Sequence, residues 1–363
     1  MKVIVSQKNL RRALGLVERV VSRNVSLPML SMVLLKTENG RLRIAATNLE
    51  IGVTSVIGAK IDEVGEIAIP GRILSDLIGA LENENVTLTT KNNNLLIHTK
   101  SYKTNILGAD AKEYPIIPKI TTKPLCTLTA PLLRNTLLAM SDSVALTETR
   151  PELSGVFIQF TEQKIVFAAT DSFRLTEKKL EIKNSQPQSV IIPRNTLVEM
   201  IRISSETEGD FTVRMGDNQI GFSNEDVEVV SRLVDGHYPD YAKVVPEHFV
   251  SKVLINREEF EKAVRLAGLF SSNIADIRLQ CDEGVVKVSA SNSDKGEMEA
   301  SVEAVLKNEP FELSLNYRYL LDGLKVIPGD KTVIEFTGKG GPLVLRPADD
   351  KKDTLYLIMP LRS

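Results

Sequence analysis

The residues that most often carry catalysis or hold metals are few and scattered in this chain. Its three histidines, His98, His237 and His248, lack the spacing of metal ligands, and no cysteine or acidic cluster completes them. No GxSxG nucleophile elbow is present, and no GxGxxG motif follows an expected strand. We therefore expect no catalytic residue, no metal site and no cofactor.

One glycine-rich stretch, Gly338-Lys339-Gly340-Gly341, is the nearest approach to a phosphate-binding loop. It lacks the GxxxxGK[ST] spacing and lies between two expected strands, which favours a hairpin turn. The adjacent acids Glu258 and Glu259 fall in the first turn of an expected helix, where the helix dipole stabilises negative charge. These patterns favour a binding or scaffolding protein over an enzyme.

Basic side chains gather on particular helices although the net charge is only −2, from 45 basic and 47 acidic residues. A nucleic-acid-binding protein usually has a visible basic excess, so the total argues mildly against one. The first expected helix carries Lys8, Arg11 and Arg12, with Arg23 just after it. Three later helices each begin with an arginine, at Arg72, Arg194 and Arg318. These charges are either solvated helix faces or a weakly basic surface for phosphates.

The helices and strands that must position these residues recur three times. Thr47-Asn48, Thr170-Asp171 and Ser291-Asn292 each follow a strand, at spacings of 123 and then 121 residues. Each unit has two amphipathic helices among alternating strands. The expected helices span 10–21, 71–81, 132–144, 194–203, 260–270 and 317–326, and Ser6, Thr129 and Asn256 are the expected caps of three of them.

This repeat predicts an α+β fold of three similar domains, each with two helices on antiparallel sheets. The domain borders are expected at 1–121, 122–248 and 249–363, with short, proline-containing seams between them. No apolar run approaches the roughly 18 residues of a membrane span. The N-terminus does not resemble a secretory signal, and Cys126 and Cys281 lie far apart, so we expect a cytoplasmic protein with reduced thiols.

Several motifs, taken in their order along the whole chain, are similar to the bacterial DNA polymerase III beta subunit family, the sliding clamps. They are LPML at 27–30, ATNLE at 46–50, RPELSG at 150–155, ATDSFRL at 169–175, LVDGHYPDY at 233–241 and YLIMPLR at 356–362. The resemblance implies a six-domain ring formed by a head-to-tail homodimer, with helices lining a hole for duplex DNA. It also implies a processivity factor for the DNA polymerase III catalytic subunit, loaded by a separate ATP-dependent clamp loader.

Three sets of site residues follow from the resemblance. Contacts to double-stranded DNA, without sequence specificity, are expected from Lys8, Arg11, Arg12, Arg23, Asn24, Arg72, Thr147, Arg150 and Arg194. A cleft for clamp-binding peptides of polymerases and repair proteins is expected from Leu153, Thr170, Ser172, Phe173, Arg174, Leu175, Pro239, Lys243, Val244, Leu357, Met359, Pro360, Leu361 and Arg362. The dimer interface is expected at Thr104, Ile106, Leu269 and Phe270.

Three positions depart from residues found in some family members, which puts details of binding in question. Asn24 and Thr147 stand where an Arg and a Gln occur, and Phe173 stands where many members have His. Two other functions remain open. A scaffold that does not form a ring would be a monomer using the same cleft, and a three-domain enzyme would need a polar constellation at one inter-domain cleft.

Overall fold

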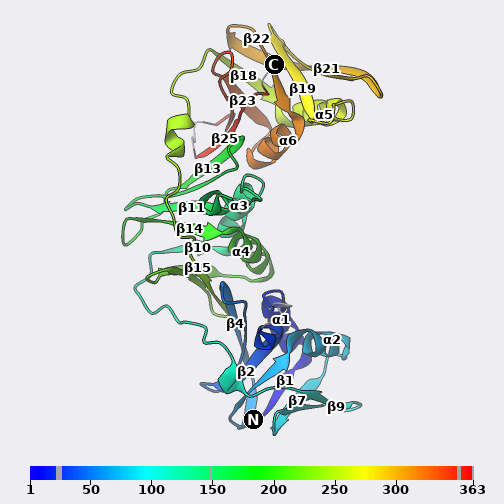
Figure 1. Cartoon of the computed structure of the whole chain (residues 1–363), viewed down its shortest axis with the longest axis vertical. Coiled ribbons are helices and arrows are strands. Elements are labelled where there is room, and N and C mark those ends of the chain that lie inside the picture. The colour runs from blue at the N-terminus through cyan, green and yellow to red at the C-terminus, as the bar shows by residue number, and fades with distance from the viewer. Residues whose placement is uncertain (22–26, 148, 350–352, 362–363) are drawn as a thin grey trace. The chain divides into compact units, whose positions relative to one another are not determined.

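The computed structural model describes residues 1–21, 27–147, 149–349 and 353–361. Within them, each third of the chain runs strand, helix, three strands, strand, helix, three strands, and the short β5 (Lys60–Glu63) is the one addition (Figure 1). This order confirms the predicted α+β fold with three similar domains.

The six α-helices of the described residues are α1 (Gln7–Glu18), α2 (Gly71–Ala80), α3 (Ala130–Met140), α4 (Arg194–Glu206), α5 (Arg257–Gly268) and α6 (Tyr317–Val326). Besides β5, the strands of the first third are β1 (Lys2–Ser6), β2 (Met32–Glu38), β3 (Arg41–Thr47), β4 (Ile51–Gly58), β6 (Glu66–Pro70), β7 (Asn85–Lys91), β8 (Asn94–His98) and β9 (Lys103–Leu107).

The strands of the middle third are β10 (Cys126–Thr129), β11 (Gly155–Phe160), β12 (Ile165–Thr170), β13 (Arg174–Leu180), β14 (Gln188–Pro193), β15 (Asp210–Met215), β16 (Gln219–Ser223) and β17 (Val227–Arg232). Those of the last third are β18 (Ser251–Asn256), β19 (Asp276–Asp282), β20 (Val285–Asn292), β21 (Gly296–Asn308), β22 (Phe311–Asn316), β23 (Lys331–Phe336), β24 (Leu343–Pro347) and β25 (Thr354–Ile358).

Spatial contacts divide the chain into two compact units rather than along the sequence repeat. The first unit comprises Met1–Arg134 and Val198–Leu233, and the second comprises Asn135–Leu197 and Val234–Ser363. The first unit holds a five-stranded sheet, β5-β1-β7-β8-β9, and an eight-stranded sheet, β10-β15-β16-β17-β4-β3-β2-β6. The second holds a twelve-stranded sheet, β14-β11-β12-β13-β25-β24-β23-β18-β21-β20-β19-β22.

The middle third is shared because its strands continue the sheets of both neighbours. In the first unit β17 pairs antiparallel with β4, with Val229 opposite Val53. In the second unit β13 pairs antiparallel with β25, with Leu175 opposite Leu357. Continuous backbone pairing therefore joins successive repeats within each unit.

The repeated Thr-Asn and Thr-Asp pairs make the same tight corner after a strand. Asn48 Oδ1 accepts hydrogen bonds from the N–H groups of Glu50 and Ile51, and Asp171 Oδ1 does so from Phe173 and Arg174. The residue between, Leu49 or Ser172, adopts a positive φ of 75° or 78°. Side-chain bonds of this kind stabilise a turn that the backbone alone would disfavour, which explains why the motif recurs.

The polar helix caps predicted from the sequence are confirmed. Ser6 accepts a hydrogen bond from the Asn9 N–H at 3.2 Å, and Asn256 accepts one from Glu259 at 3.1 Å. Thr129 accepts one from Leu132 at 3.3 Å. Because these caps fix the first turn, α1, α3 and α5 begin two to three residues before the predicted ranges.

The glycine-rich stretch at 338–341 is the predicted turn between β23 and β24. Gly338 and Gly340 adopt positive φ values of 109° and 80°. The Gly341 N–H donates to the Gly338 carbonyl at 3.1 Å.

No helix of the described chain is long and apolar enough to cross a membrane.

Candidate nucleic-acid and peptide-binding sites

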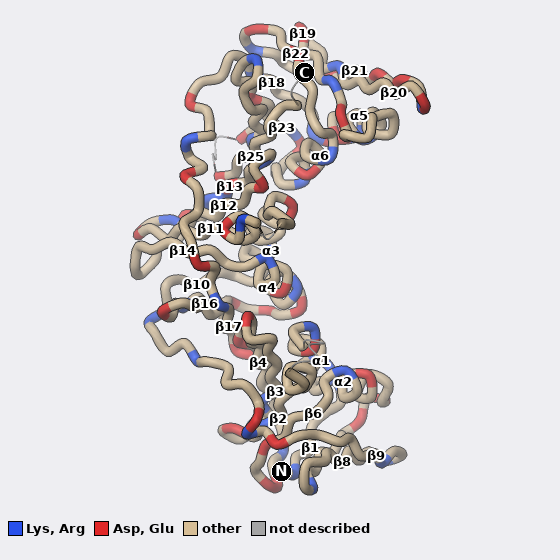
Figure 2. Tube along the Cα trace, in the orientation of Figure 1, with Lys and Arg blue, Asp and Glu red and all other residues tan. Residues whose placement is uncertain are grey.

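Lys and Arg residues occur along α1, α2 and α4 (Figure 2). Those predicted on these helices to face DNA are exposed: Lys8, Arg11, Arg12, Arg72 and Arg194. Lys8, Arg11 and Arg12 lie on α1, and Arg72 lies in the first turn of α2. Arg12 pairs with Asp226 at 3.0 Å, and Arg72 is 3.8 Å from Asp76, one helical turn further on. These cations lie in the first unit on exposed helix surface, where phosphates could reach them.

A second group of predicted DNA contacts converges at the start of α4, in the second unit. The Ser154 N–H donates to the Arg150 carbonyl at 3.3 Å, and the Ser154 hydroxyl donates to the Thr147 carbonyl. The Arg194 N–H donates to the Ser154 carbonyl at 3.1 Å. Ser154 thus holds three exposed predicted residues together beside a helix N-terminus, where the dipole favours anions.

Three predicted site residues, Arg23, Asn24 and Arg362, lie outside the described residues. Their roles therefore remain predictions.

The predicted cleft residues in the described chain all belong to the second unit, and we call this set the peptide patch: Leu153, Thr170, Ser172–Leu175, Pro239, Lys243, Val244, Leu357 and Met359–Leu361. Its framework is the β13–β25 strand pair, which continues beyond β25 because the Met359 N–H donates to the Phe173 carbonyl at 2.8 Å. Thr170 fixes the adjoining corner through its hydroxyl, which donates to the Arg174 carbonyl at 2.6 Å.

The peptide patch has an apolar floor and an exposed apolar rim. Leu175 and Leu357 are buried with Val344 and Leu355, and Met359 packs partly buried against them. Phe173 is 59% exposed and Val244 is 52% exposed. Leu175 is therefore part of the core, whereas Val244 is available to a ligand.

The segment that follows residue 233 is held against this floor by aromatic residues. Tyr238 stacks on Phe157 with ring centroids 5.1 Å apart, and Tyr241 meets the same ring edge-on at 6.1 Å. The Tyr241 hydroxyl donates to Glu177 Oε2 at 2.8 Å. Burial raises the pKa of Tyr241, and the Glu177 carboxylate raises it further, so the phenol remains a donor. This anchorage positions Val244.

A charged cluster lies beside the strand pair. Arg174 donates from Nε to Asp171 at 3.0 Å and from Nη1 to Asp322 at 2.5 Å, and its guanidinium lies 4.4 Å from the centre of the Tyr319 ring. Lys325 pairs with Asp322 at 2.8 Å. Arg174 is thus held by two carboxylates rather than left free.

The predicted interface residues lie in different units. Thr104 and Ile106 are in β9, an edge strand that pairs with β8, and Ile106 is 6% exposed. The neighbouring Leu107 is 71% exposed. Leu269, just after α5, is 63% exposed, and Phe270 packs against the hydrophobic core of the last third of the chain. In each pair, one residue or its neighbour presents apolar surface to solvent.

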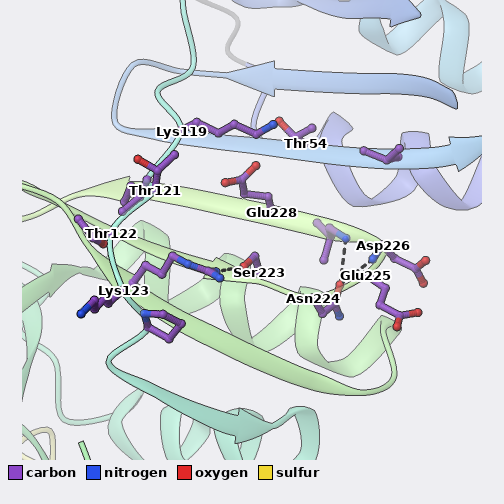
Figure 3. A pocket seen from close by; sticks show the side chains of 15 residues that line it. Thr54, Lys119, Thr121, Thr122, Lys123, Ser223, Asn224, Glu225, Asp226 and Glu228 are labelled. Atoms are coloured by element: carbon purple, nitrogen blue, oxygen red, sulfur yellow. Dashed lines mark hydrogen bonds between the residues drawn. The ribbon is translucent and has the colours of Figure 1, made fainter. Parts of the chain in front are cut away.

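A cavity of about 610 Å³ in the first unit is lined by none of the predicted site residues (Figure 3). It lies between the 119–124 segment, β4 and the β16–β17 hairpin, and its lining includes Lys119, Lys123, Arg214, Glu225 and Glu228. Arg214 donates to the Ser223 hydroxyl at 2.9 Å across its wall. The mixed charges provide no constellation typical of a catalytic site.

Within the described residues, no group of His, Cys, Asp or Glu side chains could hold a metal.

Sequence reasoning missed several residues that build these sites. Tyr241 lies within the LVDGHYPDY motif but was not assigned to the site, although an aromatic residue in such a loop is a signal of packing. Ser154 lies within the RPELSG motif but was likewise not assigned to the site. Asp322 and Tyr319 gave no signal, because both contact Arg174, which is distant in sequence.

Comparison with known proteins covers nearly the whole chain. Models of the N-terminal, central and C-terminal domains of the DNA polymerase III beta subunit match residues 1–118, 127–240 and 242–362. The beta sliding clamp of Staphylococcus aureus is 30% identical over 358 residues, covering 95% of each chain.

Solved structures give the same result. The DNA polymerase sliding clamp of Bacillus subtilis superposes with a TM-score of 0.96 and 25% identity, over 100% of this chain and 99% of that one. The sliding clamp of Bartonella birtlesii bound to griselimycin superposes with a TM-score of 0.92 and 28% identity, over 100% of both chains. The chain therefore belongs to the DNA polymerase III beta subunit family of sliding clamps: it is a processivity factor without catalytic activity that works as a dimer around DNA and binds the polymerase and clamp-binding peptides.

Proposed function

We propose that this clamp acts in the cytoplasm through three domains, 1–121, 122–248 and 249–363, and through the three residue sets predicted above. The threefold order of helices and strands supports these borders, as do the family models, which meet close to them. The observation that carries the proposed peptide site is the Met359–Phe173 backbone hydrogen bond, which places an exposed aromatic ring beside the chain's C-terminal segment.

The peptide patch takes the apolar anchors of a clamp-binding peptide. Partly buried Met359 and exposed Phe173 and Val244 offer apolar area, and the buried Leu175 and Leu357 support them from below. Such a combination of apolar lining and a few polar groups is typical of peptide-binding sites. Griselimycin, which is bound to the clamp from Bartonella birtlesii, is a suitable probe.

Deletion of Met359–Ser363 tests this site. We expect loss of griselimycin binding in calorimetry, with the dimer unchanged in sedimentation velocity. Met359→Ala keeps the backbone hydrogen bond and should weaken binding by about tenfold or more, because a buried apolar side chain contributes roughly 2 kcal/mol. Ile116→Ala is a matched control, since Ile116 is an apolar residue that is 93% exposed in the other unit. Unchanged binding by the deletion variant would refute the site.

The DNA surface consists of the exposed cations of α1, α2 and the start of α4. Contacts to phosphates carry no sequence information and let a protein slide, so a ring needs only a weakly basic wall. Threading tests the topology. The protein should remain after a high-salt wash on a linear duplex blocked at both ends, and should leave when one block is cut away. Equal loss from blocked and open duplex, at a concentration where the protein is dimeric, would favour the non-ring scaffold.

The dimer seam joins β9 of one subunit to β21 of the other. Within the described residues, β9 has a free edge, and Gly296–Glu303 of β21 pairs with β20 alone. Free edges pair readily with another chain. Their charges are complementary, because Lys100 and Lys103 are exposed beside one edge and Glu297 and Glu299 beside the other.

Reversal of these charges tests the seam. Lys100→Glu with Lys103→Glu should shift the protein towards monomer in sedimentation velocity. Mixing this variant with Glu297→Lys/Glu299→Lys should restore dimers. A double-lysine variant that stays fully dimeric, even at high dilution, would place the seam elsewhere.

A further inference from the structure

Two of the cations predicted to face DNA are already paired with carboxylates of the same chain. Arg12 Nη2 lies 3.0 Å from Asp226 Oδ2, and Arg72 Nε lies 3.8 Å from Asp76 Oδ2. On the same α1 surface, Lys8 and Arg11 have no ion-pair partner among the described residues. The basic surface is therefore divided into free and paired cations.

Asp226 is held rigidly in the position from which it reaches Arg12. Its carbonyl accepts hydrogen bonds from the Val56 N–H at 3.1 Å and the Ser55 hydroxyl at 3.0 Å. Its own N–H donates to Asn224 Oδ1 at 3.0 Å. The backbone of the β16–β17 turn is thus fixed against β4, and the carboxylate of Asp226 is presented to α1 by a firm support.

The Arg12–Asp226 pair remains open to solvent and to competing anions. Its side chains are 52% and 48% exposed. Both residues line a cavity of about 290 Å³ together with Asn9 and Arg41, so a further cation lies beside the pair. A phosphate that approaches Arg12 must therefore compete with a carboxylate, whereas one that approaches Arg11 need not.

We propose that Asp226 is a positioning residue that limits the grip of Arg12 on phosphate and so favours sliding over tight binding. This inference rests on the proposed function, in which α1 faces DNA. An unpaired cation that neutralises a phosphate releases a counterion and adds about 0.9 to the salt slope of binding. A cation paired with a carboxylate neutralises a phosphate less fully, so fewer counterions leave the DNA, and the carboxylate also repels the DNA. Asp76 acts in the same sense on Arg72, more weakly because the contact is longer.

Asp226→Asn tests the inference, because it removes the charge with almost no change in shape. We expect the dissociation constant for a short duplex, measured by fluorescence anisotropy in a NaCl series, to fall about threefold to fivefold at low salt. The salt slope should steepen by up to about 0.9. On duplex blocked at both ends, the diffusion coefficient of the variant should fall. A misfolded variant would bind the duplex more weakly, so misfolding would not produce the expected gain in affinity.

A double-mutant cycle separates release of Arg12 from simple loss of a negative charge. In an Arg12→Gln background, Asp226→Asn should change the slope little. Glu312→Gln is a matched control, since Glu312 pairs with Arg278 at 2.6 Å outside the DNA set. An unchanged slope for Asp226→Asn, or the same increase in the Arg12→Gln background, would overturn the inference. Absence of salt-dependent binding by the wild-type protein would instead refute the proposed DNA surface.

Discussion

Gly323 and Gly15 both lie in helices, and the structure predicts opposite effects when each is replaced by alanine. A Cβ on Gly323, in α6, would lie 2.4 Å from Tyr356 Cδ1 and 2.9 Å from Leu345 Cδ1. Tyr356 and Leu345 are both fully buried, so neither can move aside into solvent. A Cβ on Gly15, in α1, would meet nothing within 4 Å.

The magnitudes follow from two opposing effects. Replacing Gly by Ala within a helix stabilises it by about 1 kcal/mol. Overpacking a dense core costs about 1–3 kcal/mol, and contact at 2.4 Å with a buried ring belongs at the upper end of that range. We therefore expect Gly15→Ala to stabilise the protein by about 1 kcal/mol and Gly323→Ala to destabilise it by about 1–2 kcal/mol.

Urea unfolding of both variants beside the wild type, followed by circular dichroism, measures this difference. Gly323→Ala should also weaken griselimycin binding, because Tyr356 lies in β25, whose next residues carry the peptide patch. Gly15→Ala should leave that affinity unchanged. If Gly323→Ala raises the urea midpoint as much as Gly15→Ala does, the packing around Tyr356 is not as tight as argued.

Three further predictions concern other buried contacts. Burial raises the pKa of the Cys126 thiol to about 12, so it should resist a thiol reagent at pH 8 until urea unfolds the chain. Labelling of the folded protein at the rate of the unfolded chain would contradict this protection. Because the pKa of Cys126 is higher in the folded state, the free energy of unfolding should fall as pH rises above the ordinary thiol pKa towards 12. Arg202→Met should cost about 3 kcal/mol in urea unfolding, because Arg202 donates to the Gly15 and Leu16 carbonyls near the end of α1 and pairs with the largely buried Glu199. Gly52→Ala should lower the melting temperature, since the new Cβ would lie 2.6 Å from Ile117 Cγ2. An unchanged melting temperature would show that the segment around Ile117 can shift at no cost in stability.

The repeat was predictable because it depends on local chemistry. The Thr-Asn and Thr-Asp corners and the caps at Ser6 and Asn256 each use side chains within a few residues of the backbone they bind. Such contacts leave a signal in residue type and spacing. Three recurrences of that signal sufficed to predict the fold class.

The contacts between successive repeats were not predictable in the same way. The alternation of apolar and polar residues in β4 and β17 does not predict that these two strands pair, because an edge strand has the same pattern whichever strand lies beside it. The 119–124 segment contains one of the predicted short, proline-containing seams, yet it packs on the first unit: Ile120 approaches Gly221 and Thr122 donates to the Met215 carbonyl at 2.8 Å. Contacts between residues so far apart in sequence leave no periodic trace.

The charge of the DNA surface connects the sequence to the mechanism. Six of its predicted cations lie in the described residues, and if each neutralised a phosphate, each subunit would contribute about −5 to the salt slope. Pairing Arg12 with Asp226 and Arg72 with Asp76 lowers that expectation to about −4 per subunit. For an ordinary DNA-binding protein this would be a loss, because affinity alone keeps it on the duplex. A closed ring stays on DNA by topology, so weaker contacts cost it little residence time and leave it free to move with the polymerase.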